Sequence, residues 1–314
     1  MEVFQGLVGQ GKAIKLLERA VELNRIAPAY LFSGVAGIGR SQAARSFAQI
    51  LLSIDVAPEK LANVEHKIIT GNHPDLLWVE PTYLSKGEVY TAAQAAEKGL
   101  QYKTPPKIRI EQIRSLTQFL NRPILEANRK VIVIEDVQTM AESPANALLK
   151  TLEEPGNATL ILIALDADAL LTTLVSRCQK IQFYPLAEAK LKQILEQEGH
   201  IEIINHPEIL AIAQGSPGKA IAAWQQLQTI PEELLQQLKT SISSPLAAFN
   251  LAKSISGELD SASQLWLVDY LQHYHWQQNQ QVQMMEQWEK TRRYLLSYVQ
   301  PRLVWECALL NLLK

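Results

Sequence analysis

The sequence has few of the features that are typical of secreted proteins, membrane-spanning proteins or proteins with a structural metal site. It has only two cysteines, Cys178 and Cys307, too few for a disulfide framework or a four-cysteine zinc module. No run approaches the roughly 18–20 apolar residues that a membrane span needs. The first five residues have neither a basic region nor an apolar core of a signal peptide. We therefore expect a cytoplasmic, reducing location, no membrane partner, no zinc and no other metal.

The chain also lacks a dominant charge. Its 30 basic and 32 acidic residues give a net charge of −2, so overall charge does not indicate a nucleic-acid binder. One stretch departs from this balance: residues 103–130 hold seven basic and two acidic residues, a local charge of +5. The candidate DNA-contacting residues are Lys103, Lys107, Arg109, Arg114, Arg122 and Arg129. Such clusters are solvated faces as often as phosphate-binding ones, so both interpretations stay open.

The first part of the chain has the pattern of a parallel α/β domain. At 314 residues, two or three domains are expected. Up to residue 183, short apolar runs alternate with amphipathic stretches, which is typical of βαβ units. We predict strands at 29–33, 76–80, 131–134, 160–165 and 180–183, and helices at 11–24, 41–52, 110–120 and 143–153. Residues 82–106 are predicted to be a surface insertion with one short helix at 92–98.

The rest of the chain is predicted to be helical. Three short helices at 191–198, 207–214 and 219–228 form a small unit, and helical spacing continues to the end. The predicted fold class is thus α/β plus all-α, with domains 1–183, 184–228 and 229–314.

A candidate phosphate-binding loop follows the first predicted strand. Residues 34–41 fit the P-loop pattern G-x-x-x-x-G-K-[ST], with Gly34, Gly37 and Gly39, at every place but one. The loop connects a strand to a helix, where backbone amides and the helix N-terminus can cradle phosphate. Ser41 is placed to bind Mg²⁺. Arg40, however, stands where lysine belongs, and a planar guanidinium does not replace a compact ammonium.

Two further positions of this candidate nucleotide site depart from an active ATPase. A P-loop enzyme needs an acid at the end of a strand to hold Mg²⁺, often followed by an acid that orients water. Here Glu135 and Asp136 follow the strand in the reverse of the usual order, and they could equally be solvated acids. Leu165 is apolar where a polar residue would face the γ-phosphate. We expect a degenerate site that needs no cofactor; weakly or structurally bound ATP or ADP stays an open question.

Two motifs resemble the clamp-loader branch of the AAA+ ATPases. Residues 143–155, SPANALLKTLEEP, are similar to the signature helix of that family, and Ser176, Arg177 and Cys178 are similar to its arginine-finger motif. Weaker matches are found at 8–10, 29–34, 72–75 and 215–218. The resemblance covers residues 8–219. Beyond about residue 230, the chain is similar to the family only in its predicted helical structure.

The resemblance implies an AAA+ P-loop domain, a helical lid and a C-terminal helical collar that mediates oligomerisation. It further implies a stator in a pentameric ring with the δ and γ/τ subunits of bacterial DNA polymerase III. The ring would load the sliding clamp onto primer–template DNA during replication. Arg177, flanked by Ser176 and Cys178, would act in trans on ATP bound to a γ/τ neighbour, and the chain would have no autonomous ATPase activity.

The alternative is an active, DNA-stimulated AAA+ ATPase, either a motor-type clamp-loader subunit or a DNA-remodelling enzyme. The otherwise complete loop favours it, whereas Arg40, the reversed acid pair and Leu165 argue against it. ATP turnover by the isolated chain discriminates between the two.

Overall fold

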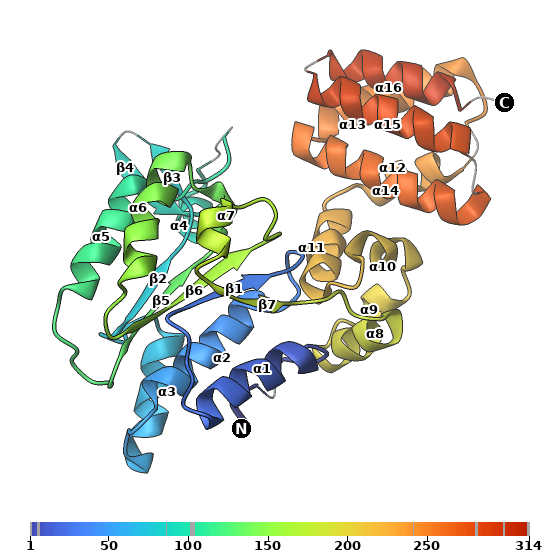
Figure 1. Cartoon of the computed structure of the whole chain (residues 1–314). Coiled ribbons are helices and arrows are strands. Elements are labelled where there is room, and N and C mark those ends of the chain that lie inside the picture. Colours follow the sequence, from blue (N-terminus) through green and yellow to red (C-terminus); the bar gives the residue numbers. More distant parts are fainter. Residues whose placement is uncertain are drawn as a thin grey trace. The chain divides into compact units, whose positions relative to one another are not determined.

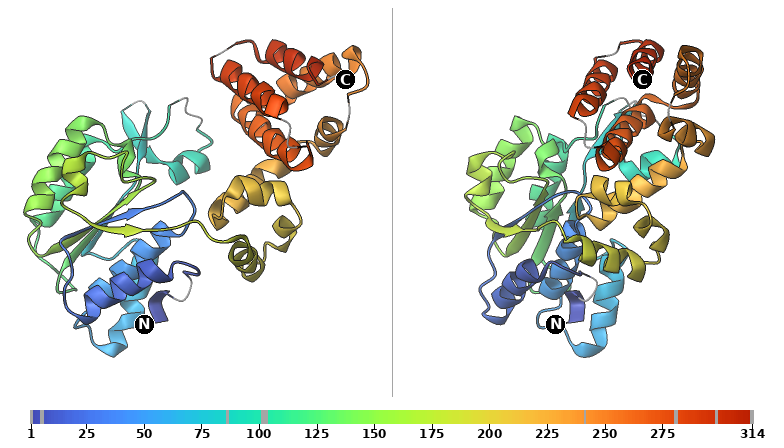
Figure 2. Two further views of the ribbon diagram at one scale, coloured as in Figure 1. Left: turned by 45° about the vertical axis from the view of Figure 1, so that its right-hand side comes forward. Right: turned by 90° about the vertical axis from the view of Figure 1, so that its right-hand side faces the viewer.

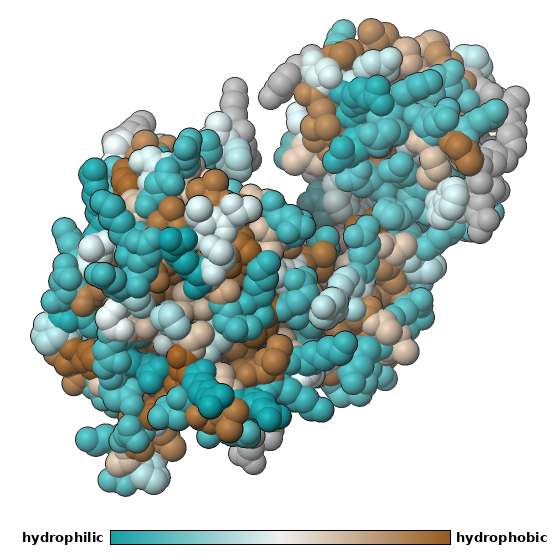
Figure 3. Space-filling view, in the orientation of Figure 1, coloured by the Kyte–Doolittle hydropathy of each residue, from teal (hydrophilic) through white to brown (hydrophobic). Residues whose placement is uncertain are grey.

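The computed structural model divides the chain into two compact units, Met1–Pro185 and Leu186–Lys314 (Figures 1 and 2). It describes residues 2–4, 7–85, 87–100, 104–240, 242–279, 282–297 and 299–312. Hydrophilic residues dominate the face seen in Figure 3, where apolar residues appear in small groups. Among the described residues, no helix has both the length and the apolar character to cross a membrane.

The first unit is built on a five-stranded parallel sheet. Its order is β2 (Leu76–Val79), β5 (Lys130–Ile134), β6 (Ala158–Ala164), β1 (Ala29–Ser33) and β7 (Gln179–Gln182). The three central strands are buried along their whole length, because helices cover both faces. One face carries α1 (Gly11–Glu22), α2 (Arg40–Leu52) and α3 (Leu61–Ile69); the other carries α5 (Ile110–Leu120) and α6 (Glu142–Glu153) (Figure 1).

This architecture confirms the predicted fold class. All five predicted strands are present within two residues of their expected ends, since continuous apolar runs between helices are typical of buried parallel strands. One end matters for the site: β6 stops at Ala164, so Leu165 lies beyond the strand that was predicted to include it. The sequence pattern missed α3 and the hairpin of β3 (Thr82–Ser85) and β4 (Glu88–Thr91). The hairpin leads into α4 (Ala92–Glu97), the short helix expected in this insertion.

The second unit is entirely helical in its described residues. Its elements are α8 (Glu188–Gln197), α9 (Ile201–Ile204), α10 (Pro207–Ala213), α11 (Pro217–Gln228), α12 (Glu232–Lys239), α13 (Pro245–Glu258), α14 (Ser261–Asn279), α15 (Val282–Leu296) and α16 (Pro301–Leu310). One apolar cluster extends from Leu191 to Leu309. Helices on both sides of residue 228 therefore share a core, and the separation of lid from collar at that residue stays a prediction.

A buried carboxylate connects the early and late helices of this unit. Glu208, in the first turn of α10, is only 7% exposed. Its Oε1 accepts a hydrogen bond from the Tyr270 hydroxyl at 2.8 Å and lies 3.5 Å from Lys239 Nζ and 3.6 Å from His206 Nδ1. Burial alone would raise the pKa of the carboxyl. Its own backbone amide, Tyr270 and the two basic groups outweigh that effect and lower the pKa.

Replacing Glu208 with Gln should therefore destabilise the helical unit at neutral pH, by about 1–3 kcal/mol of unfolding free energy. Because the folded pKa is lowered, the carboxylate contributes stability above its unfolded pKa, and this contribution is lost as the pH falls through the folded pKa. Urea unfolding should show a difference at pH 7 that shrinks below about pH 4. The exposed Glu202→Gln is the control, and equal stability of E208Q and parent at pH 7 would contradict the assignment.

Candidate functional site

The P-loop lies at the carboxyl end of the central strand β1 and is packed closely on both sides. Gly34 has φ +155°, and a Cβ there would lie 2.6 Å from the carbonyl oxygen of Phe183. Gly39 has φ +98°, and a Cβ there would lie 2.6 Å from Cδ1 of Leu7. Gly37 also has a positive φ, of 71°. The backbone of Phe183 thus leaves no room for a side chain at Gly34, and positive φ favours glycine at Gly37 and Gly39, besides any role toward phosphate.

Arg40 is turned into the protein. It is the first residue of α2, is 7% exposed, and its Nη1 donates to the carbonyl oxygen of Ala164, the last residue of β6. Burial lowers the pKa of the guanidinium, an effect that the negative charges of Asp136 and Glu135 partly oppose. Protein groups therefore engage the cation at the position where a P-loop lysine would face phosphate.

Ser41 and Glu135 are brought together across the site. Glu135 directly follows β5. The pKa of its carboxyl is raised, mainly because the group is buried. The Ser41 hydroxyl donates a hydrogen bond to it and lowers that pKa, whereas the nearby charges of Glu80 and Asp136 raise it. The hydroxyl that the sequence places as a Mg²⁺ ligand thus holds a carboxylate in this structure.

Asp136 connects the ends of two neighbouring strands. Its backbone is left-handed, with φ 46° and ψ 51°, a conformation that non-glycine residues adopt rarely. Its Oδ1 accepts from Nε2 of Gln138 at 3.0 Å, and Oε1 of Gln138 accepts from the amide of Leu165 at 3.3 Å. The apolar Leu165 side chain, 45% exposed, makes no polar contribution to the site.

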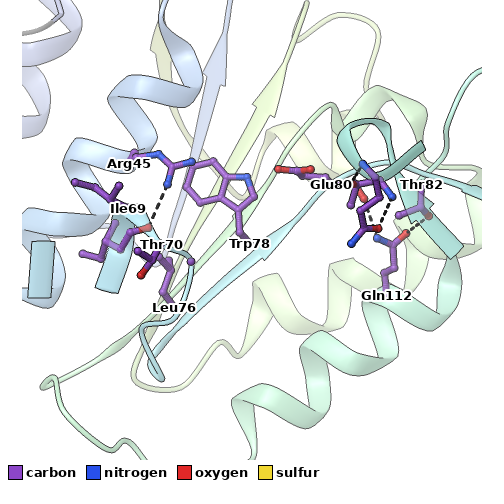
Figure 4. Close-up of a pocket in the computed structure, with 12 residues that line it drawn as sticks. Arg45, Ile69, Thr70, Leu76, Trp78, Glu80, Thr82 and Gln112 are labelled. Atoms are coloured by element: carbon purple, nitrogen blue, oxygen red, sulfur yellow. Dashed lines mark hydrogen bonds between the residues drawn. The ribbon is translucent and has the colours of Figure 1, made fainter. Parts of the chain in front are cut away.

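Two residues beside this site, Trp78 and Glu80, were not predicted from the sequence. Both lie on or just after the edge strand β2, and the charge of Glu80 acts on Glu135. The guanidinium of Arg45 stacks on Trp78, 4.7 Å from the ring centre, in a cavity of about 550 Å³ beside β2 (Figure 4). The carbonyl oxygen of Glu80 accepts from Nε2 of Gln112 at 2.8 Å. The alternation along β2 puts Trp78 and Glu80 on one face, but only the strand order brings them near Glu135.

Arg177 is not part of this cluster. The register pairs Tyr30 with Gln179 and Ser33 with Gln182, so the start of β7 lies three residues, about 10 Å, below the P-loop end of β1. Arg177 precedes that start. Its Nη1 donates to the Thr173 carbonyl at 3.0 Å, and neither of its partners belongs to the P-loop. The exposed guanidinium therefore lies toward the opposite end of the strands from the chain's own site.

The residues that flank Arg177 fix its position. The Ser176 hydroxyl donates to the carbonyl of Thr173, in the short helix α7 (Thr172–Val175), at 3.1 Å. Cys178 packs against the core of the first unit, and burial raises the pKa of its thiol to about 11. A thiol with that pKa is not a nucleophile at neutral pH. These contacts hold Ser176 and Cys178 in place on either side of Arg177. Their predicted catalytic role, as part of the arginine-finger motif, stays a prediction.

The basic stretch 103–130 is dispersed by the fold. Its candidate Lys103 lies outside the described residues, whereas Lys107, Arg114 and Arg122 are exposed. Arg109 and Arg129 are half-buried; Arg109 Nη2 donates to the Thr82 carbonyl at 3.4 Å, and Arg129 Nη1 donates to Thr159 Oγ1 at 3.5 Å.

Lys130, which contributes to the local charge of this stretch, is buried and has a structural role. Its Nζ donates to the carbonyls of Phe119 and Leu120 at 2.8 and 2.9 Å, and also to that of Arg122. It thereby satisfies the last carbonyls of α5, an 11-residue helix about 16 Å long that separates Arg109 from Arg122. Arg109, Arg129 and Lys130 are thus engaged within the chain, and DNA contact by the exposed members of the stretch stays a prediction.

Fold and site together define a parallel α/β protein with a P-loop-type turn, whose arginine is hydrogen-bonded within the chain. The family model described as "DNA polymerase III, delta subunit" matches residues 9–187. A second, described as "Cyanobacterial DNA polymerase III delta prime, C-terminal domain", matches residues 189–312. The chain therefore belongs to the DNA polymerase III delta subunit family. The two matches meet within a few residues of the division between the structural units.

The chain is similar in sequence to several bacterial DNA polymerase III subunits. The chain is 32% identical over 193 residues to DNA polymerase III subunit delta' of Bacillus subtilis, covering 60% of this chain and 52% of that protein. It is 31% identical over 234 residues to the delta' subunit of Pseudomonas aeruginosa, covering 73% and 65%. The tau subunit of Escherichia coli is 29% identical over 237 residues, covering 72% and 33%. The chain thus spans between half and two thirds of the length of its delta' relatives.

The buried charges of the site give a direct test. Arg40→Met keeps an apolar stem but leaves Glu135 and Asp136 without their cation, so we expect a loss of about 2–4 kcal/mol in unfolding free energy. Adding Glu135→Gln should recover part of that loss, because it removes the uncompensated charge. Because burial raises the pKa of Glu135, the penalty in R40M should also shrink as the pH falls and Glu135 is protonated. Chemical unfolding of the parent, R40M and the double variant, at neutral and at acidic pH, measures each free energy of unfolding.

The exposed Arg19→Met on α1 provides the matched control. An R40M variant as stable as the parent, or a double variant no more stable than R40M, would show that Arg40 does not neutralise these acids.

Proposed function

We propose that this chain is a δ′-type stator of a bacterial DNA polymerase III clamp loader. It hydrolyses no ATP itself and supplies Arg177 in trans to ATP bound by a γ/τ neighbour. The observation that carries this proposal is the separation of two positive charges. Arg40 is buried in the chain's own site, whereas Arg177 is exposed toward the opposite end of the strands.

The electrostatics of the chain's own site favour the stator role. One cation, Arg40, lies among three carboxylates, Glu80, Glu135 and Asp136. The carboxylates of the chain itself thus offset the charge of Arg40. Arg40 and Ser41, which would bind phosphate and Mg²⁺ in an active site, are engaged by Ala164 and Glu135. In this proposal the chain requires no nucleotide of its own.

The chemistry proposed for Arg177 needs an exposed, fully charged guanidinium. Charge that develops on a transferred phosphoryl group is stabilised by an arginine supplied from a neighbouring protein, and such fingers contribute about 10³–10⁵-fold to turnover. The planar fork of arginine can donate two parallel hydrogen bonds to phosphate oxygens. Side-chain exposure of 36% leaves Arg177 accessible to another subunit.

The proposed partners are those of the clamp-loader family: the δ and γ/τ subunits in the ring, and through the ring the sliding clamp and primer–template DNA. The helical second unit would hold the ring together as a collar. ATP on γ/τ would tighten the ring around DNA while the clamp is open. Hydrolysis assisted by Arg177 would then release the closed clamp on DNA.

The finger is tested by Arg177→Ala in a clamp loader reconstituted with δ and γ/τ. We expect DNA-stimulated ATP turnover to fall by the share that the site next to this chain supplies, because that site loses its transition-state arginine. Assembly, followed by size-exclusion chromatography, should be unchanged, since among the described residues the Arg177 side chain hydrogen-bonds only to Glu153 and Thr173. Arg19→Ala serves as control. Unchanged turnover in R177A would refute the finger assignment.

The isolated chain tests the competing hypothesis of an active ATPase. With Arg40 engaged internally, we expect turnover far below about 1 s⁻¹, with or without DNA. We also expect no thermal stabilisation by millimolar ATP or ADP with Mg²⁺, because a ligand stabilises only a protein that binds it. A DNA-stimulated rate near 1 s⁻¹ would favour the active ATPase, and a raised melting temperature without turnover would indicate a structural nucleotide.

A further inference from the structure

An ion pair joins the two family motifs of the first unit. Glu153 is the last residue of the signature helix α6, and its Oε1 lies 2.6 Å from Nη2 of Arg177. Both side chains are accessible, at 51% for Glu153 and 36% for Arg177. The two residues are 24 positions apart in sequence, so the contact depends on the packing of α6 beside α7.

Glu153 and Thr173 together restrain the guanidinium. Nη1 donates to the Thr173 carbonyl at 3.0 Å, and Nη2 donates to Glu153 at 2.6 Å. A guanidinium carries five N–H donors, so these two bonds leave three for a ligand outside the chain. The side chain is thereby held in one orientation, while three of its N–H groups stay available to donate.

The exposure of the pair indicates what it does. A solvent-accessible ion pair contributes little to folding stability. A free arginine side chain, however, samples many rotamers, and ordering it when a ligand arrives opposes binding and catalysis. A carboxylate that orders the side chain beforehand reduces this entropic loss at the reaction step.

We propose that Glu153 is the positioning residue of the finger. It holds the Arg177 guanidinium in the orientation in which the guanidinium meets the γ-phosphate of ATP on the neighbouring subunit. Glu153 touches neither ATP nor the reacting atoms and acts only through Arg177. This inference rests on the proposed function, because it concerns the same arginine.

The neighbouring Glu154 offers a matched control. It is also exposed, it carries the same charge, and its backbone amide donates to the Lys150 carbonyl. No ion pair of its carboxylate occurs among the described residues. A general effect of acidic charge at the end of α6 would therefore appear equally with Glu153→Gln and Glu154→Gln.

The experiment measures DNA-stimulated ATP hydrolysis by the reconstituted clamp loader, with this chain carrying E153Q, E153D or E154Q, each with and without Arg177→Ala. We expect E153Q to lower the Arg177-dependent part of kcat about tenfold, within the ~10²-fold that misplacing a catalytic group costs. The KM for ATP should not change, since ATP is bound by the neighbour. E153D, which keeps the charge, should recover part of the loss, and E154Q should match the parent.

The R177A background separates the possible outcomes. E153Q should cause no additional loss there, because its effect is exerted through Arg177. An equal loss in both backgrounds, an effect of E154Q as large as that of E153Q, or an unchanged kcat in E153Q would each overturn the positioning role while leaving the finger intact. If R177A itself leaves turnover unchanged, the proposed function fails, and the positioning role fails with it.

Discussion

The buried guanidinium of Arg40 organises the carboxyl ends of three neighbouring strands. It reaches from the start of α2 to the last carbonyl of β6 and lies near the two acids that follow β5. A cation this deeply buried persists only where hydrogen bonds and opposite charges offset its desolvation. The remaining groups of the site depend on that arrangement: Ser41 bonds Glu135, and Gln138 connects Asp136 to Leu165.

The same constraint explains how the P-loop backbone is kept although its arginine bonds within the chain. The loop glycines are fixed by close contacts with Phe183 and Leu7, so the turn is retained for packing whether or not phosphate binds. A lysine would leave its charge for a ligand, whereas the forked guanidinium finds acceptors within the chain. Under the proposed function the loop is a structural element, and the chain's contribution to hydrolysis would be made by Arg177.

That contribution depends on how α6, α7 and β7 follow one another. Cys178 is anchored in the core, Ser176 is bonded to its own helical turn, and the side chain between them is left exposed beside Glu153. In the second unit, Glu208 connects α10 to α12 and α14 through Lys239 and Tyr270. The first unit thus presents an arginine outward, and the second unit is a helical body with one apolar core, as the proposed stator would require.

The sequence by itself determined the parallel sheet, the P-loop and its arginine, because apolar runs and glycine spacing are local patterns. It also pointed to Arg177 as the candidate arginine finger, through a short motif. It did not show the β3–β4 hairpin or α3, which are short elements of four to nine residues. Only the tertiary structure decided that Arg40 faces inward, that Lys130 caps α5 and that Glu153 holds Arg177. These pairings join residues from separate elements, and strand order and helix packing, which no local pattern encodes, set which charges meet.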